Sequence, residues 1–190
     1  MKIIAVVIAL MLIAAPVCAG EAFVSYQAGV LMPEDDNFGY GKGFFTQGAE
    51  AGYSFKYAEV GCEWMITNLK TLFDSTFTDH SVIGTVKIKY PLTWKWLDRL
   101  TPYGVVGAGM HFFTNQNMKG SPDQIGNDAC GPETIADSGF ALKYGGGIQY
   151  RLTDRVSIFG EASYRYGNEG QGSSLAVYSW IYNGGIRIKF

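Results

Sequence analysis

The last thirteen residues of the chain, Tyr178–Phe190 (YSWIYNGGIRIKF), decide how the rest of the sequence is interpreted. Every second position is aromatic or aliphatic apart from one glycine: Tyr178, Trp180, Tyr182, Gly184, Ile186, Ile188 and Phe190. The positions between them are mostly polar or charged: Ser179, Ile181, Asn183, Gly185, Arg187 and Lys189. Successive side chains of a β-strand point to opposite faces. The stretch therefore predicts a strand with one apolar and one polar face.

Such a strand is an unusual ending for a soluble protein, because an open sheet would expose its edge as well as its apolar face. A barrel closed in lipid removes the edge and directs the apolar face to lipid and the polar face to the lumen. A soluble barrel of the lipocalin type also has about eight strands, but its apolar face points inward around a ligand. Alternation alone does not distinguish the two. The charged residues on the polar face and the terminal Phe190 favour the membrane barrel.

The N-terminus has the pattern of an export signal. Met1–Lys2 is a basic start, Ile3–Ala15 is an apolar run, and Val17–Ala19 provides a small-residue cleavage site before Gly20. The apolar run is shorter than the ~20 residues that a membrane-spanning helix requires. Cys18 could instead carry a lipid anchor, but the preceding valine is bulkier than the small residue usual there. We expect residues 1–19 to be a cleaved signal peptide and residues 20–190 to form one outer-membrane β-barrel domain.

Composition bounds the remaining choices. The chain has 190 residues, which is one domain's worth, and a formal net charge of -2, which gives no reason to expect a nucleic-acid partner. It contains 12 Tyr, 12 Phe, 4 Trp and 25 Gly. Aromatic residues suit the interface girdles of a membrane barrel, and glycines suit strongly curved strands.

Alternation continues through the chain and predicts an all-β, eight-stranded antiparallel up-and-down transmembrane barrel. The predicted strands are 22–31, 45–55, 57–66, 81–90, 103–113, 140–150, 156–166 and 178–190. The connections at 32–43, 67–79, 114–138 and 167–174 are long and polar, those at 55–57 and 152–155 are tight, and 91–101 is intermediate. Outer-membrane barrels have short periplasmic turns and long outside loops. Both mature termini are therefore expected on the periplasmic side.

Three stretches resemble a known family. The segment Tyr144–Tyr166 (YGGGIQYRLTDRVSIFGEASYRY) looks like the hairpin typical of small bacterial outer-membrane β-barrel proteins, the OmpA-like eight-stranded group, and Thr101–Gly109 (TPYGVVGAG) resembles their Pro-Tyr, glycine-alternating strand. The C-terminal strand is similar to the signal that the family's barrel-assembly machinery recognises, with Tyr182, Ile186, Ile188 and Phe190 as the signal residues. The resemblance implies a Gram-negative outer membrane with its lipid and lipopolysaccharide as surroundings. It implies no specific activity.

Charged residues on the inward faces are the first candidates for a functional site. The expected lumen network comprises Glu50, Glu63, Lys87, Lys143, Glu161, Arg165 and Arg187, with Glu59, Lys89 and Lys189 on the same faces. An eight-stranded barrel has room inside mainly for side chains, and unpaired buried charges are costly. Two interpretations remain open: a plug of ion pairs that fills the interior, or a narrow gated pore for ions or small solutes.

Two further groups of residues match known sites only in part. The run His111–Asn115 (HFFTN) resembles the His-x-Ser-Asn signature of lipid A deacylases, but its spacing is one residue longer and Thr114 replaces the serine, so the two side chains would face opposite ways. The acidic residues Asp123, Asp128, Glu133 and Asp137 could bind a divalent cation, yet their spacing matches no calcium loop. We expect no metal or cofactor. Cys62 and Cys130 are expected on a lipid-facing strand and in a loop, without a disulfide.

The function expected from the sequence is non-enzymatic. The barrel would have a structural or surface-interaction role, with a polar, side-chain-filled lumen and long extracellular loops that meet an unknown extracellular ligand. A porin-like channel is the first alternative, and a lipid A-modifying hydrolase is the second.

Overall fold

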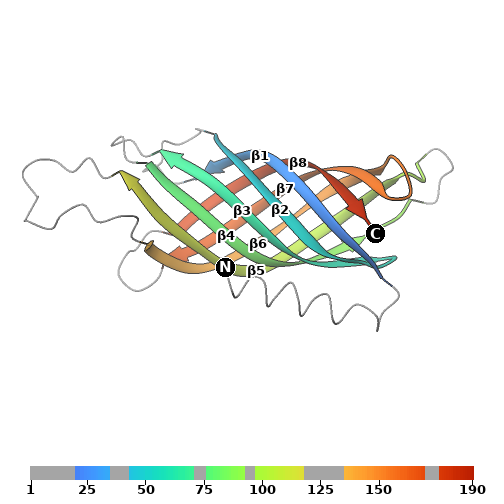
Figure 1. Cartoon of the computed structure of the whole chain (residues 1–190), viewed down its shortest axis with the longest axis horizontal. Helices are drawn as coiled ribbons and strands as arrows, with labels where there is room; N and C mark the ends of the chain where they lie inside the picture. Colours follow the sequence, from blue (N-terminus) through green and yellow to red (C-terminus); the bar gives the residue numbers. More distant parts are fainter. Residues whose placement is uncertain (1–19, 35–42, 71–75, 93–96, 118–134, 170–175) are drawn as a thin grey trace, which may run out of the picture.

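The computed structural model describes residues 20–34, 43–70, 76–92, 97–117, 135–169 and 176–190 (Figure 1). These residues form one closed barrel of eight antiparallel strands, in which each strand pairs with its neighbours in sequence and β8 pairs with β1. The eight-stranded antiparallel barrel expected from alternation is confirmed. The predicted signal peptide, residues 1–19, lies outside the described residues.

The strands are β1 (Glu21–Pro33), β2 (Phe44–Ser54), β3 (Ala58–Lys70), β4 (Thr76–Lys89), β5 (Leu100–Asn117), β6 (Ile135–Arg151), β7 (Val156–Glu169) and β8 (Ala176–Lys189). Tight connections at 55–57 and 152–155 join β2 to β3 and β6 to β7 at one end of the barrel, which we call the turn end. Phe190 N donates to Ala22 O at 2.9 Å, so both ends of the described barrel chain also lie there. The opposite end is the loop end.

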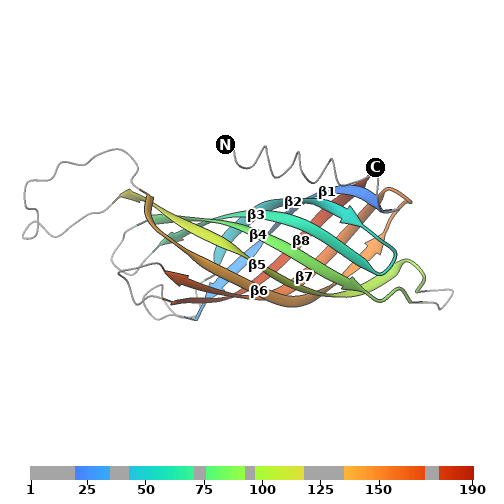
Figure 2. The ribbon, with the colours of Figure 1, turned by 90° about the horizontal axis from the view of Figure 1, so that it is seen from below.

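Several strands are longer than alternation predicted, mostly at the loop end, although β5 also begins three residues early at the turn end, at Leu100. β3 and β4 include most of the predicted 67–79 loop. β5 extends to Asn117, β6 begins at Ile135, and β7 extends to Glu169. These extensions are mostly polar, because a strand that projects past the bilayer needs backbone pairing but no apolar outer face. Figures 1 and 2 show β5 and β6 running past the other strands at this end.

The register fixes how closely the barrel is wound. A path that starts at Phe23 and steps from each residue to its register partner on the next strand goes once around the barrel and returns to β1 at Pro33. It passes through Gly52, Gly61, Thr85, Gly107, Lys143, Arg165 and Ser179. The stagger is therefore 33 − 23 = 10 residues along β1. Eight strands with this stagger enclose a space that side chains fill. Close packing explains two inward glycines, because a Cβ on Gly109 would meet the backbone of β4 and one on Gly185 would meet Tyr26 O and Phe159.

The two faces of the wall are chemically opposite. Large apolar side chains are exposed outside, among them Phe45, Ile88, Val106, Ile148 and Ile186, whereas most of the buried inward residues are polar or charged. A lipocalin-type soluble barrel would have the reverse arrangement, because its apolar face surrounds the ligand. The outer wall therefore requires lipid.

Within the residues that the structure describes, no helix is long and apolar enough to span a membrane.

Candidate functional site: the charged lumen

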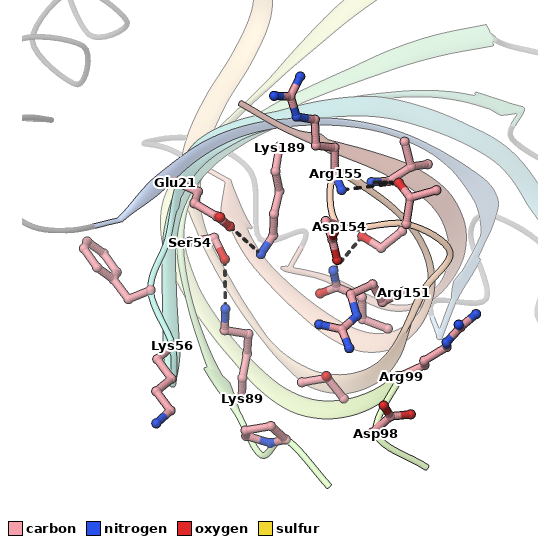
Figure 3. Close-up of a pocket in the computed structure, with 17 residues that line it drawn as sticks. Glu21, Ser54, Lys56, Lys89, Asp98, Arg99, Arg151, Asp154, Arg155 and Lys189 are labelled. Carbon is pink, nitrogen blue, oxygen red and sulfur yellow. Dashed lines mark hydrogen bonds and ion pairs between the residues drawn. The ribbon is translucent and has the colours of Figure 1, made fainter. Parts of the chain in front are cut away.

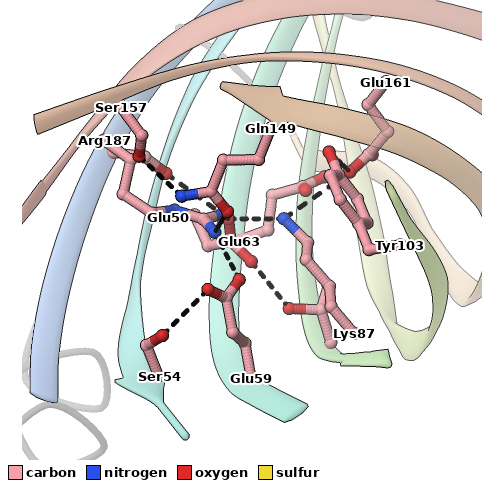
Figure 4. Close-up of polar contacts among 12 residues, drawn as sticks. Glu50, Ser54, Glu59, Glu63, Lys87, Tyr103, Gln149, Ser157, Glu161 and Arg187 are labelled. Carbon is pink, nitrogen blue, oxygen red and sulfur yellow. Dashed lines mark hydrogen bonds and ion pairs between the residues drawn. The ribbon is translucent and has the colours of Figure 1, made fainter. Parts of the chain in front are cut away.

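Arg187 of β8 is the centre of one group of buried ion pairs (Figure 4). Its Nη1 donates to Glu59 Oε2 of β3, and its Nη2 donates to Glu50 Oε2 of β2 at 2.9 Å. The same Glu50 oxygen accepts from Lys87 Nζ of β4 at 2.7 Å. One carboxylate thus joins two cations from different strands, and all these side chains are buried.

Lys143 of β6 forms a second group directly beside the first. Its Nζ lies 2.6 Å from Glu63 Oε2 and 2.7 Å from Glu161 Oε1. Lys87 Nζ is 3.5 Å from Glu161 Oε2 and therefore links the two groups. The Tyr103 hydroxyl donates to the same Glu161 oxygen at 3.1 Å. The pairs make one network that crosses the lumen, with members from β2, β3, β4, β5, β6, β7 and β8.

Neutral side chains complete the environment of this network. Thr85 Oγ1 donates to Glu50 Oε1 at 3.0 Å. The Arg187 guanidinium lies 4.3 Å from the centre of the Phe23 ring and 5.3 Å from that of Phe159, and Lys87 Nζ lies 5.4 Å from the Tyr103 ring centre. Ring faces attract cations, most strongly where water is excluded. The cations are thus held by carboxylates and aromatic faces together, which suits a fixed structure.

Arg165 stands apart from the other predicted network residues. It pairs with Asp79 of β4 nearer the loop end, and His111 Nδ1 lies 4.0 Å from the other Asp79 oxygen. The predicted loop at 67–79 is wrong at Asp79, which lies on the inward face of β4. Continuing the alternation of β4 two residues back from Ser81 would have placed Asp79 on the inward face.

An apolar layer also lies along the β1, β3 and β8 side of the lumen, which is therefore less uniformly polar than the sequence predicted. Leu31, Met65, Leu69 and Ile181 form a buried cluster, each with at most 1% of its surface exposed. Met65 is two residues beyond Glu63 toward the loop end, so this layer lies on the loop-end side of the Lys143 group. It removes space through which water or ions could pass.

Several inward polar residues, among them Gln27, Ser163 and Asn183, retain unused hydrogen-bonding atoms. The side chains of Gln27, Ser163 and Asn183 are buried, and their polar atoms have no partner among the described residues. Buried polar groups are normally satisfied by protein or by trapped water. These positions on β1, β7 and β8 suit isolated waters within the plug.

Those of the remaining sequence candidates that the structure describes do not form a site. Alternation of β5 puts His111 in the lumen and Thr114 on the outer wall, where Thr114 Oγ1 donates to Thr78 O at 3.3 Å. The described residues contain no group of three His, Cys, Asp or Glu able to hold a metal ion. Asp123, Asp128, Glu133 and Cys130 lie outside the described residues, as does the Asp137 side chain. Cys62 is a free, half-buried thiol on the outer face of β3.

Comparison with known proteins shows the family to which this barrel belongs. The sequence profile of a family described as the outer membrane protein beta-barrel domain matches residues 5–186. The chain belongs to this outer-membrane β-barrel family. It is therefore an integral protein of a Gram-negative outer membrane, as the resemblance of its hairpins implied. A search of curated protein sequences found no match.

Solved structures of other small outer-membrane proteins share the fold of this barrel. Neisserial surface protein A is 16% identical with a TM-score of 0.66, over 89% of this chain and 97% of that protein. OprG from Pseudomonas aeruginosa is 15% identical with a TM-score of 0.57, over 90% and 96%. The attachment invasion locus protein Ail of Yersinia pestis is 19% identical with a TM-score of 0.51, over 90% and 100%. Identities this low establish the architecture alone.

An aromatic belt lies on the outer wall of this outer-membrane barrel. Its members on β6, β7 and β8 are Tyr144, Tyr164, Tyr166, Tyr178, Trp180 and Tyr182, and neighbouring rings lie 5.1–6.4 Å apart between centroids. Tyr164 OH and Trp180 Nε1 donate to the Glu34 carboxylate at 2.8 and 3.0 Å. Tyrosine and tryptophan concentrate where the bilayer meets water. The belt marks that boundary toward the loop end.

The four residues assigned to an assembly signal all lie on this outer face. Tyr182, Ile186, Ile188 and Phe190 are exposed along β8 and at its end. They lie on the outward face of the strand that closes the barrel against β1. A recognition role for these four side chains is a proposal that follows from the family resemblance.

Proposed function

We propose that this protein is a closed, non-enzymatic outer-membrane scaffold that presents its loop-end connections at the cell surface. The observation that carries the proposal is the lumen network. Cations from β4, β6 and β8 each contact carboxylates from other strands, and the apolar Leu31 layer lies beyond them. Ion pairs that join opposite walls hold the register and occupy the space that a pore would need.

The loop end is the proposed outside, with both mature termini in the periplasm. β5 and β6 have 18 and 17 residues and are longer than strands such as β2, which has 11. A long connection on a rigid barrel is a common place for a binding function. The proposed partners are the surrounding lipid and lipopolysaccharide, the barrel-assembly machinery at the C-terminal strand, and an extracellular ligand at the loops.

A narrow channel is the second candidate, and the buried polar atoms of Gln27, Ser163 and Asn183 favour it. Waters at these positions could join into a path if the ion pairs exchanged partners. A swelling assay with liposomes containing the folded protein distinguishes the two candidates. A closed scaffold admits neither arabinose nor glycine at a rate above that of protein-free liposomes, whereas uptake of either solute would replace the scaffold with the channel.

Hydrolysis of lipid A has no support from the geometry, since His111 and Thr114 occupy opposite faces of β5. Lipid A mass spectra from cells with and without the protein test this directly. We expect identical spectra. A new deacylated species that disappears in His111→Ala would show that the protein is an enzyme.

A further inference from the structure

The turn end contains a cavity that adjoins the buried network, because Lys89 and Gln149 of its lining contact Glu59 and Arg187 (Figure 3). It has a volume of about 380 Å³ and is formed by the mouth of the barrel together with the turns at 55–57 and 152–155. Six cationic side chains line it: Lys56, Lys89, Arg99, Arg151, Arg155 and Lys189. The carboxylates in its lining are Glu21, Asp98 and Asp154, so the lining has a formal excess of 6 − 3 = 3 positive charges.

Part of this positive charge has no carboxylate partner among the described residues. Lys189 Nζ is 3.1 Å from Glu21 Oε2, and Lys89 Nζ is 3.4 Å from Glu59 Oε1. Arg99, Arg151 and Arg155 are exposed and form no ion pair with any residue that the structure describes. Three arginines therefore remain without carboxylate partners in this part of the chain.

The shape and the neutral lining favour a compact anion. Figure 3 shows Lys89, Lys189 and Arg151 reaching into the opening, whereas Lys56 points away from it. Polar groups of Ser54, Thr101, Gln149 and Ser157 also line the cavity. Arginine presents a planar set of donors that matches phosphate in a two-bond geometry, and hydrogen bonds between opposite charges are the strong ones. A phosphate-class anion would satisfy several donors at once.

The position of the cavity also decides the source of the ligand. Inward residues of β2, β4, β6, β7 and β8 contribute to its lining, so it lies within the ring of strands. Lipid headgroups surround the outer wall instead, and a lipid would have to leave its leaflet to enter. We propose that the turn-end cavity binds a soluble, multivalent phosphate-class anion through Lys89, Arg151 and Lys189. This proposal is independent of whether the lumen conducts.

Titration calorimetry with inorganic pyrophosphate tests the proposal, using the folded protein in phosphatidylcholine nanodiscs at about 0.15 M salt, where long-range attraction is screened. Loss of a charge-assisted contact predicts about tenfold weaker binding by Arg151→Gln. Glu21→Gln frees Lys189 and should strengthen binding. Lys56→Gln removes the same charge as Arg151→Gln from a side chain that points away, and should change affinity less than about twofold.

Three results would overturn the site. Wild-type protein that releases no heat and shows no saturable binding lacks it. Equal losses in Arg151→Gln and Lys56→Gln would show diffuse attraction instead of a built cavity. Loss of pyrophosphate binding in discs that contain phosphatidylglycerol, beyond about tenfold, would assign the cavity to lipid headgroups. Circular dichroism spectra and unfolding temperatures serve as the folding control for each variant. They should match those of the wild-type protein, because the substituted side chains are exposed.

Discussion

The two faces of β8 show the two kinds of interaction that hold this barrel. On the outer face, Trp180 and Tyr182 belong to the aromatic belt and Ile186 faces lipid, and many other apolar side chains could occupy these positions. Inside, Arg187 needs Glu50 and Glu59 at defined positions on two other strands. The residues of the outer face must therefore only match the polarity of the bilayer at their depth, whereas the residues of the inner face must match particular partners. Substitutions on the two faces should fail for different reasons.

The largest expected effect comes from the inner face. Lys143→Met leaves Glu63 and Glu161 buried without their shared cation, which should lower the free energy of unfolding by about 3–5 kcal/mol. Denaturant unfolding in lipid vesicles measures the change. The matched control adds Glu63→Gln and Glu161→Gln, which removes the uncompensated charge, and it should recover most of the loss. A cost below about 1 kcal/mol for Lys143→Met would mean that the network is not structural.

The outer face should respond to depth. Ile186→Arg, on the outer face of β8 midway between the belt residue Tyr182 and Phe190, places a charge in lipid and should cost about 2–4 kcal/mol of unfolding free energy. Tyr90→Arg, just past the end of β4, should cost about 0–1 kcal/mol. Both are measured by the same unfolding experiment. Equal costs at the two positions would contradict the placement of the lipid boundary.

Coupling energies should separate the lumen network from the Asp79–Arg165 pair. Glu50→Gln and Lys87→Met alter one shared contact, so their double variant should depart from additivity by about 0.5–3 kcal/mol. Glu50→Gln and Asp79→Asn alter contacts in separate groups and should add within about 0.5 kcal/mol. A double-mutant cycle measures both. Similar coupling in the two cycles would mean that the lumen behaves as a single unit.

The smallest effect is expected at the exposed pair of the turn end. Glu21→Gln breaks the contact with Lys189, but the Glu21 side chain is 61% exposed and water screens the pair. Exposed ion pairs contribute about 0–1 kcal/mol. The unfolding free energy should stay within that range of wild type, while pyrophosphate binding changes. A larger loss would make Glu21 a structural residue and weaken its use as a binding control.

The fold could be predicted from sequence because a period of two is visible in single strands. Alternation placed Arg187 and Lys143 on the polar face, and the structure has both in the lumen. It could not say which carboxylate each would meet, because partners depend on the stagger of strands far apart in sequence. Asp79 was assigned to a loop because polar strand ends and loops have similar compositions. The apolar Leu31–Ile181 contact depends on closure of β1 against β8, which no local pattern reveals.

Single-channel recording from the folded wild-type protein in a planar bilayer tests the central claim most directly. If paired charges and the apolar layer fill the lumen, the current should remain at the baseline of the bare membrane in protein shown to be inserted. Discrete, reproducible steps of constant size would contradict the closed plug. They would make Glu63 and Arg187 the lining of a pore.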